Sequence, residues 1–258
     1  MVERQIQRVG FLSGRENVPF APIHPETPFW AIGDVHGRRD LLDALILRLT
    51  DEPAVFVGDL IDRGPDSHAV LDRVFELCTT LPGEFKALKG NHEQILLDFL
   101  QDPVGVGPSW RRIGGLQTMA SYGIVLPVGA RSKQDYVTAR DALKQTIGPR
   151  MIAWLQSLPY AYTNGNVHVV HAGANPMRSM ADQDPSDLIW GHRDFGRIAR
   201  GDGQWVVHGH VIVKSPAKSD GRIAIDTGAY ATGVLTAAYI APGFVDYVAT
   251  DAAKKKHE

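Results

Sequence analysis

Residues 54–64 read AVFVGDLIDRG, four apolar residues followed by a glycine and a cluster of charged side chains. The apolar run has the length of a buried strand, and the glycine with Asp59 marks the turn at which that strand ends. An amphipathic segment follows, with Val70, Leu71 and Val74 on one helical face. The stretch therefore predicts a strand, a polar loop and a helix in that order.

The same order occurs on both sides of this stretch. FWAI at 29–32 ends at Gly33 and Asp34, and FKAL at 85–88 ends at GNH at 90–92; each leads into an amphipathic segment. Repeated alternation predicts an α/β fold whose sheet is parallel at least in its first half. Five more strand-like runs lie at 167–170, 205–207, 222–225, 234–240 and 244–248, and the short spacing of the last three predicts antiparallel pairing.

We expect a single domain over residues 1–258 with one helical insertion. The segment 102–158 is rich in glycine and shows no clear strand, so we interpret it as an insertion that borders the substrate cleft. Residues 1–28 carry four prolines from 19 onward and are predicted to form an extended surface arm, so that the core starts after Pro28. Residues 252–258 are predicted to be a solvated tail.

Composition excludes several classes of protein. With 44% hydrophobic and 22% charged residues, the chain has the usage of a globular protein. Its net charge of -2 argues against a nucleic-acid partner, so Trp110, Arg111 and Arg112 are interpreted as a solvated helical face. No apolar run approaches the roughly 18 residues of a membrane helix, and neither a signal peptide nor a cysteine beyond Cys78 is found. We therefore expect a cytoplasmic protein without membrane contact.

Potential metal ligands follow the predicted strands. Loops at the carboxyl ends of strands in an open α/β sheet form the ligand crevice, so these side chains should converge. They are Asp34, His36, Asp59, the Asn91-His92 pair, His171 and His210. Carboxylates, imidazoles and an amide, without a thiolate, suit Mn, Fe or Zn. Six ligands suit two ions that share a carboxylate, and Asp59 is central in the order.

The motifs GDVHG (33–37), GDLIDRG (58–64), GNHE (90–93), HAG (171–173) and GH (209–210) resemble the signature blocks of the calcineurin-like metallophosphoesterases. More narrowly, they resemble the phosphoprotein phosphatase branch, which includes bacterial and phage serine/threonine phosphatases and symmetrical diadenosine tetraphosphatases. The resemblance covers about residues 29–240. It implies a four-layer fold of two mixed β-sheets flanked by helices.

The resemblance also implies roles for the matched residues. One divalent ion would be held by Asp34, His36 and Asp59, and a second by Asp59, Asn91, His171 and His210, with manganese as the first expectation and iron or zinc as alternatives. A hydroxide that bridges the ions would attack phosphorus. His92 would act as general acid, oriented by Asp62, and Arg63 would bind the phosphoryl oxygens.

Three assignments are less direct. Relatives carry another phosphate-binding arginine shortly after a tryptophan, and Arg193 is the candidate although its spacing is one residue long; His192 is the weaker alternative. His208 lies two residues before His210, and the motif register favours His210 as the ligand. His168 points to the opposite strand face from His171 and is interpreted as structural.

The resulting expectation is a metal-dependent phosphomonoesterase, a serine/threonine-type protein phosphatase that acts on phosphoserine and phosphothreonine in proteins, with phosphotyrosine as a further candidate. Its partner would be a phosphorylated protein or peptide. The alternative is a symmetrical bis(5'-nucleosyl)-tetraphosphatase, which would use the same metal centre on a pyrophosphate bond. A catalytically inactive phosphoprotein-binding protein is the third interpretation, and the intact ligand set argues against it.

Overall fold

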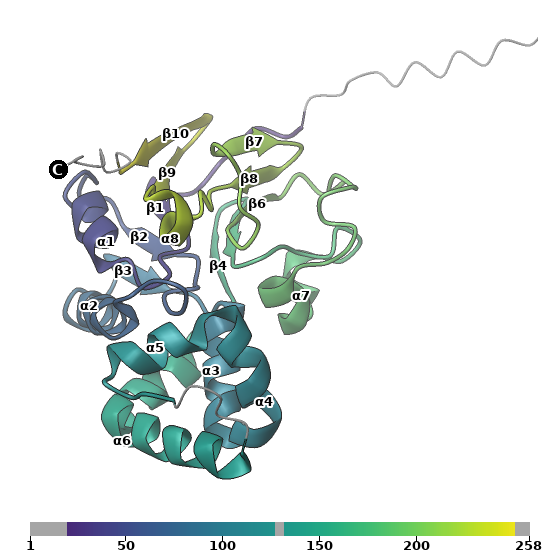
Figure 1. The fold of residues 1–258 in the computed structure, drawn as a ribbon. Helices are drawn as coiled ribbons and strands as arrows, with labels where there is room; N and C mark the ends of the chain where they lie inside the picture. The colour runs from purple at the N-terminus through teal and green to yellow at the C-terminus, as the bar shows by residue number, and fades with distance from the viewer. Residues whose placement is uncertain (1–19, 127–131, 251–258) are drawn as a thin grey trace, which may run out of the picture.

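The computed structural model describes residues 20–126 and 132–250, and its ten strands form two mixed sheets. The first sheet has the order β10-β9-β1-β2-β3, with bounds Phe29–Ile32 (β1), Ala54–Phe56 (β2), Phe85–Ala87 (β3), Thr236–Ala241 (β9) and Phe244–Ala249 (β10). Strands β1, β2 and β3 are parallel, whereas β9 is antiparallel to both β1 and β10. Figure 1 shows both sheets in the upper part of the molecule.

The second sheet has the order β4-β5-β6-β8-β7. Its strands are Ala161–Asn164 (β4), Val167–Val170 (β5), Trp205–His208 (β6), Ala217–Ser219 (β7) and Arg222–Ala224 (β8). The three inner strands are parallel and the two edge strands are antiparallel to their neighbours. The predicted pair of mixed sheets is confirmed.

The alternation of side chains along β1 explains why the sheets pack in layers. Phe29 and Ala31 belong to the cluster between the two sheets, whereas Trp30 and Ile32 face the helices on the other side. This period of two is that of a strand buried on both faces. Helices α1 (Arg39–Ile46) and α2 (Ser67–Thr80) cover the outer face of the first sheet. The outer face of the second sheet is covered by α7 (Pro185–Trp190) and the loops around it.

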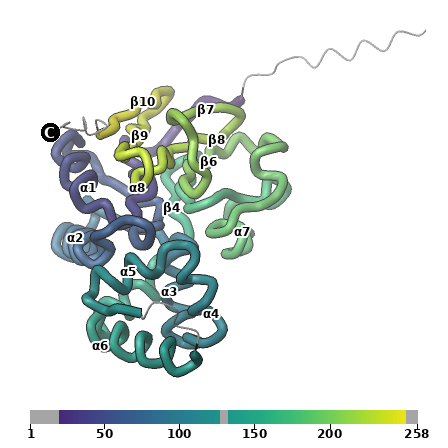
Figure 2. Tube along the Cα trace, viewed as in Figure 1, coloured from purple at the N-terminus to yellow at the C-terminus, as the bar shows by residue number. Residues whose placement is uncertain are grey.

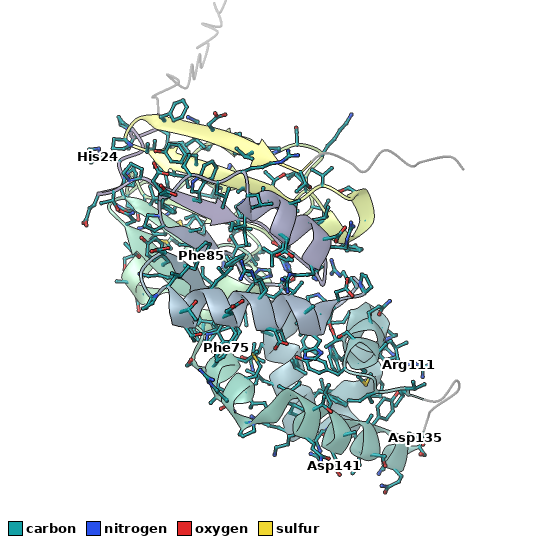
Figure 3. The ribbon with its side chains drawn as sticks, turned by 90° about the vertical axis from the view of Figure 1, so that its left-hand side faces the viewer. His24, Phe75, Phe85, Arg111, Asp135 and Asp141 are labelled. Atoms are coloured by element: carbon teal, nitrogen blue, oxygen red, sulfur yellow. The ribbon has the colours of Figure 1, made fainter. Side chains whose placement is uncertain are left out.

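A helical unit lies below the sheets in Figures 1 and 2. It comprises α3 (Asn91–Gln101), α4 (Pro103–Trp110), the π-helical turn η1 (Arg111–Gly115), α5 (Leu116–Ser121) and α6 (Lys133–Ser157). Within 102–158, the described residues form no strand. Figure 3 labels Phe75 on α2 where that helix faces the unit, and its ring packs edge-on against Trp154 of α6, with 5.4 Å between the ring centroids. The division of residues 1–258 into one domain with an insertion stays a prediction.

Three expectations about the strands were wrong or incomplete. The run at 222–225 forms β8, which pairs parallel to β6 in the second sheet and is not part of the antiparallel β9-β10 hairpin. The chain crosses between the sheets through a loop that contains the short helix α8 (Ala229–Thr232), so proximity in sequence was a poor guide to pairing. Strands β4 and β7 were not predicted, because both are polar edge strands without an apolar run.

Part of the predicted surface arm is packed. Ile23 is buried in the cluster between the sheets, and Phe20 contacts Trp205 edge-on at 5.0 Å between centroids. The core therefore begins before Pro28. Residues 1–19 of the arm and residues 252–258 of the predicted tail lie outside the described residues. Among the helices in the described part of the chain, none is long and apolar enough to cross a membrane.

Candidate active site and metal centre

The predicted ligands come together because the parallel strands of both sheets end at a common edge. Asn91 is at the centre of one group: its Oδ1 lies 2.8 Å from His171 Nε2 and 3.0 Å from His210 Nδ1. Asp59 is close to both sides, with Oδ1 3.3 Å from His171 Nε2 and Oδ2 3.5 Å from His36 Nε2. Five loops that are distant in sequence thus deliver their side chains to one place.

Two sets of side chains have ligand atoms within 4.8 Å of one another. One set is His36, Asp59 and His92, and the other is Asp59, His171 and His210. Asp59 belongs to both sets, which is the position that the sequence predicts for a bridging carboxylate. Its buried side chain is the shared element of the centre.

Unpaired atoms in the centre fit a cation. Asp34 Oδ1 and His36 Nε2 are buried, and neither has a hydrogen-bond partner among the described residues. The other ring nitrogen of His36 lies 2.7 Å from the Ile61 carbonyl, which can only accept, so Nδ1 carries the proton and Nε2 offers a lone pair. Metal-binding imidazoles are oriented in this way by the bond at their second nitrogen.

Asp34 differs from Asp59 in the contacts of its two carboxylate oxygens. Its Oδ2 accepts a hydrogen bond from the backbone N–H of His210 at 3.0 Å, which leaves the buried Oδ1 as the atom available to an ion. Asp34 is absent from the two sets above, where His92 takes the third place beside His36 and Asp59. The assignment of Asp34 as a ligand therefore stays a prediction that its unpaired oxygen favours.

Burial and neighbouring charges shift the pKa values of the buried groups in the centre. Burial, and after it the nearby Asp226, raises the pKa of Asp34 well above its usual value. Burial also acts on Asp59, but His171 and His92 outweigh it and hold the pKa of Asp59 well below normal. Burial disfavours charged His171, yet the negative charge of Asp59 raises the pKa of His171 to about 9. The carboxylates thus need positive charge nearby, and a divalent cation supplies it.

His92 and Asp62 form a buried hydrogen-bonded pair. His92 Nδ1 lies 2.6 Å from Asp62 Oδ2, so its Nε2 faces the centre, 3.8 Å from Asp59 Oδ2. Two more side chains donate to Asp62: Trp110 Nε1 to Oδ2 at 2.8 Å and Thr118 Oγ1 to Oδ1 at 2.5 Å. Burial lowers the pKa of His92, but Asp59 and Asp62 more than offset this and leave that pKa raised. The carboxylate is fixed in one orientation and in turn fixes the imidazole.

Arg63 lies between the metal centre and the helical unit. Its Nη2 is 3.3 Å from His92 Nε2, and its guanidinium lies over the ring of Tyr230 at 4.8 Å. The same ring contacts His36 edge-on at 5.4 Å. Tyr230 therefore supports both a predicted ligand and the predicted phosphate-binding arginine.

Arg193 is not in this cluster. Its side chain is 86% exposed, with Nε 3.6 Å from Asp194 Oδ2. It lines, together with His192, a cavity of about 460 Å³ that also borders His210. Arg193 therefore shares a cavity with His210 but not with Arg63, and its role in phosphate binding stays a prediction.

His208 and His168, the two histidines near the predicted ligands that were not chosen as ligands, have structural contacts. His208 packs edge-on against Phe195 at 5.0 Å and its Nδ1 lies 3.0 Å from the Gly209 carbonyl, so it belongs to neither set of ligands. His168 bonds to Thr163 at 2.9 Å and to Gln204 at 2.8 Å. Both sets of contacts agree with the choice of His210 over His208 and of His171 over His168 as predicted ligands.

Sequence reasoning missed several side chains that shape the site. Trp110 and Thr118 were not assigned to it, and the interpretation of Trp110 as part of a solvated face was wrong, because its side chain is fully buried against Asp62. Asp226 directly follows the β8 region and could have been found by the strand-end rule that identified the others. Glu93 accepts from the backbone N–H groups of Asp59, Leu60 and Gly90 at 2.8–2.9 Å and so fixes the loop that carries Asp59.

The backbone of the site is strained. Six non-glycine residues in the described part of the chain have positive φ, and five of them are His36, Asp59, Asp62, Arg63 and His210. Left-handed backbone is unfavourable for residues with a Cβ and is retained where the surroundings enforce it. The concentration of this strain at one place marks a functional site independently of side-chain chemistry.

Fold and site together are those of a metallophosphoesterase domain. The chain belongs to the calcineurin-like phosphoesterase family, whose sequence model matches residues 27–214. The symmetrical bis(5'-nucleosyl)-tetraphosphatase of Ralstonia nicotianae is 32% identical over 156 residues, which are 60% of this chain and 45% of that protein. Serine/threonine-protein phosphatase 2 of Escherichia coli is 34% identical over 96 residues, 36% of this chain and 40% of that protein.

The fold is shared more widely. A solved serine/threonine phosphatase from Saccharomyces cerevisiae superposes with a TM-score of 0.60 at 15% identity, over 90% of this chain and 82% of that one. The chain spans less than half the length of each of the two sequence relatives above. The chain carries a domain of the metallophosphoesterase family, and because its relatives include both tetraphosphatases and protein phosphatases, its substrate has to be argued from the site.

Proposed function

We propose that the protein is a phosphomonoesterase that removes phosphate from phosphoserine and phosphothreonine in proteins. The observation that carries this proposal is the buried Asp62–His92 pair, in which Asp62 holds Nδ1 of His92 so that Nε2 faces the metal centre. An alkoxide leaving group is a strong base and needs a proton as the P–O bond breaks. A nucleotide leaving group from a pyrophosphate bond is a weak base and needs one much less.

Two divalent ions complete the site in this proposal. Asp34, His36 and Asp59 would hold one of them, and Asp59, Asn91, His171 and His210 the other, with manganese as the first expectation. When bound, the ions supply an activated water and polarise the phosphoryl group. The unpaired Asp34 Oδ1 and His36 Nε2 support this arrangement.

The protein's own residues would perform three tasks. Arg63, held over Tyr230, binds and orients the phosphoryl oxygens through its planar guanidinium. His92 delivers its Nε2 proton to the leaving oxygen. Asp62 keeps the Nδ1 proton of His92 in place and stabilises the charged imidazole before transfer.

Symmetrical dinucleoside tetraphosphate hydrolysis is the second candidate. A cavity of about 450 Å³ beside Arg63 is also lined by Arg111 and Arg112, and such a cavity suits a substrate with several phosphates. The Ralstonia relative carries that activity in its name. The metal centre is common to both candidates, so leaving group and cavity separate them.

The test is a substrate panel on protein stripped of metal and reloaded with manganese, iron or zinc. Phosphoserine and phosphothreonine peptides, a phosphotyrosine peptide and diadenosine tetraphosphate are compared by kcat/KM, with products separated. The proposal expects metal-dependent release of phosphate from the serine and threonine peptides, with Asp59→Asn as the inactive control. Exclusive cleavage of the dinucleotide would favour the second candidate, and phosphopeptide binding without turnover of any substrate would leave a binding protein.

A further inference from the structure

The cavity beside Arg63 has an unusual lining. It is formed by Arg63, Arg111, Arg112, Ile113, Gly114, Leu116, Gln117 and Tyr230, with three arginines and no carboxylate. The chain as a whole carries a net charge of -2, so this concentration of positive charge is local. Positive charge that lines a concave surface raises the local concentration of anions.

Two of the lining arginines, Arg63 and Arg112, differ in their ion pairing from several other arginines of the described residues. Among the described residues, no carboxylate lies within ion-pair distance of Arg63 or Arg112, whereas Arg38, Arg39, Arg73 and others pair with neighbouring acids. Arg112 is exposed on the turn η1, and Figure 3 shows its neighbour Arg111 at the edge of the helical unit. The charges of Arg63 and Arg112 are therefore available to an anionic ligand.

The cavity is joined to the metal centre through Arg63. This residue lines the cavity, and its Nη2 lies 3.3 Å from His92 Nε2. Gly114 of η1 packs against the Arg63 backbone, whose N–H lies 3.4 Å from the Gly114 carbonyl. A ligand that is bound at the metals by one phosphoryl group can therefore extend past Arg63 into the cavity.

We propose that this cavity is a second anion subsite, which binds an anionic group of the substrate next to the phosphoryl group at the metals. Arg112 would contact this second group, while Arg63 lies between the two anions. The chemistry fits either a further phosphate of a polyphosphate chain or a second acidic group on a peptide. The inference rests on the proposed phosphoester hydrolysis at the metal centre, and it makes η1 a determinant of substrate choice.

The experiment measures inhibition of p-nitrophenyl phosphate hydrolysis by orthophosphate and by tripolyphosphate in the manganese-loaded protein. For Arg112→Gln, we expect the ratio of the tripolyphosphate to the orthophosphate inhibition constant to rise by about fivefold, the size of one partly exposed ion pair. Arg112→Glu should raise this ratio further. Arg197→Gln removes an exposed arginine that does not line the cavity and should leave the ratio unchanged. Metal chelation by tripolyphosphate is the same for all variants and cancels in the comparison.

Two further measurements complete the test, and the first of them identifies the source of the anion. The effect of Arg112→Gln on kcat/KM is compared for singly and doubly phosphorylated peptides and for diadenosine tetraphosphate, and a selective loss on either multiply charged substrate supports the subsite. Calorimetric titration of tripolyphosphate gives the same comparison without turnover, so a failure to hydrolyse peptides does not affect it. An unchanged inhibition ratio and unchanged tripolyphosphate binding in both Arg112 variants would overturn the proposal.

Discussion

Removing the indole N–H of Trp110 should impair proton delivery without removing metal. In Trp110→Phe, the aromatic contact with Phe99, at 4.7 Å between centroids, can persist, but the 2.8 Å bond to Asp62 is lost. Both groups are fully buried, so water cannot replace the donor. A hydrogen bond to a charged group contributes about 1.5–3 kcal/mol, and the free energy of unfolding should fall by that amount or somewhat more, because phenylalanine is smaller.

The catalytic effect should depend on the leaving group. Asp62 keeps Thr118 as a donor but is no longer fixed at Oδ2, the oxygen that holds His92. General acid catalysis is worth about 10² to 10⁴ in rate, and we expect a partial loss of about tenfold in kcat for phosphoserine. For p-nitrophenyl phosphate, whose leaving group needs little protonation, the loss should stay below about threefold.

The assay measures four quantities for the wild type and each variant: kcat for phosphoserine, kcat for p-nitrophenyl phosphate, the metal content and the urea concentration at the unfolding midpoint. Trp154→Phe is the matched control, because Trp154 is a half-buried tryptophan of α6 that packs against Phe75 and does not donate to the Asp62 carboxylate. It should lose some stability and keep both rates. Equal losses on the two substrates in Trp110→Phe, with metal retained, would refute the idea that Trp110 acts through the general acid.

Three other predictions follow from the site and the core. Asp59→Asn keeps a residue that tolerates the φ of 51° but removes the charge shared by both ligand sets, so metal analysis after dialysis should show both ions weakened; retention of a full complement would contradict the bridging role. Gly114→Ala places a Cβ 2.5 Å from the Arg63 N and should lower kcat/KM by about tenfold, whereas Gly123→Ala, at a φ of 74° in open space, should cost only stability. Burial raises the pKa of Cys78 to about 12, so the neutral thiol should react slowly with iodoacetamide at pH 8 and quickly after unfolding, as followed by mass spectrometry; rapid labelling of the native protein would contradict this.

Much of the fold was predictable because its central strands are short apolar runs that end in glycine and a polar residue. That pattern located β1, β2, β3, β5 and β6, and the side chains after them form the centre. Edge strands such as β4 and β7 carry no such pattern, since one face is open to solvent. The pairing of β8 depends on a crossing between sheets that no local signal reports.

The supporting side chains were harder to predict for a different reason. The two arginines after Trp110 indicate an exposed helical face. This indication is wrong for Trp110 because the π-helical turn η1 changes the helical register immediately after it. The only polar atom of the Trp110 side chain donates a hydrogen bond to an aspartate 48 residues away, and sequence periodicity does not predict a contact of this kind. The cytoplasmic location, the native metal and the phosphoprotein partner stay predictions.

The contacts of Trp110 and Thr118 with Asp62 bear on how such enzymes diverge. Chimaeras that exchange the segment 102–158 between relatives, in order to transfer substrate preference, would also exchange both of these donors. A recipient that lacks them would keep its metal ligands and still be a poor acid catalyst. On the proposed mechanism, a change of substrate preference through this segment would also change proton transfer, so an exchanged segment must carry a matching hydrogen-bond donor for Asp62.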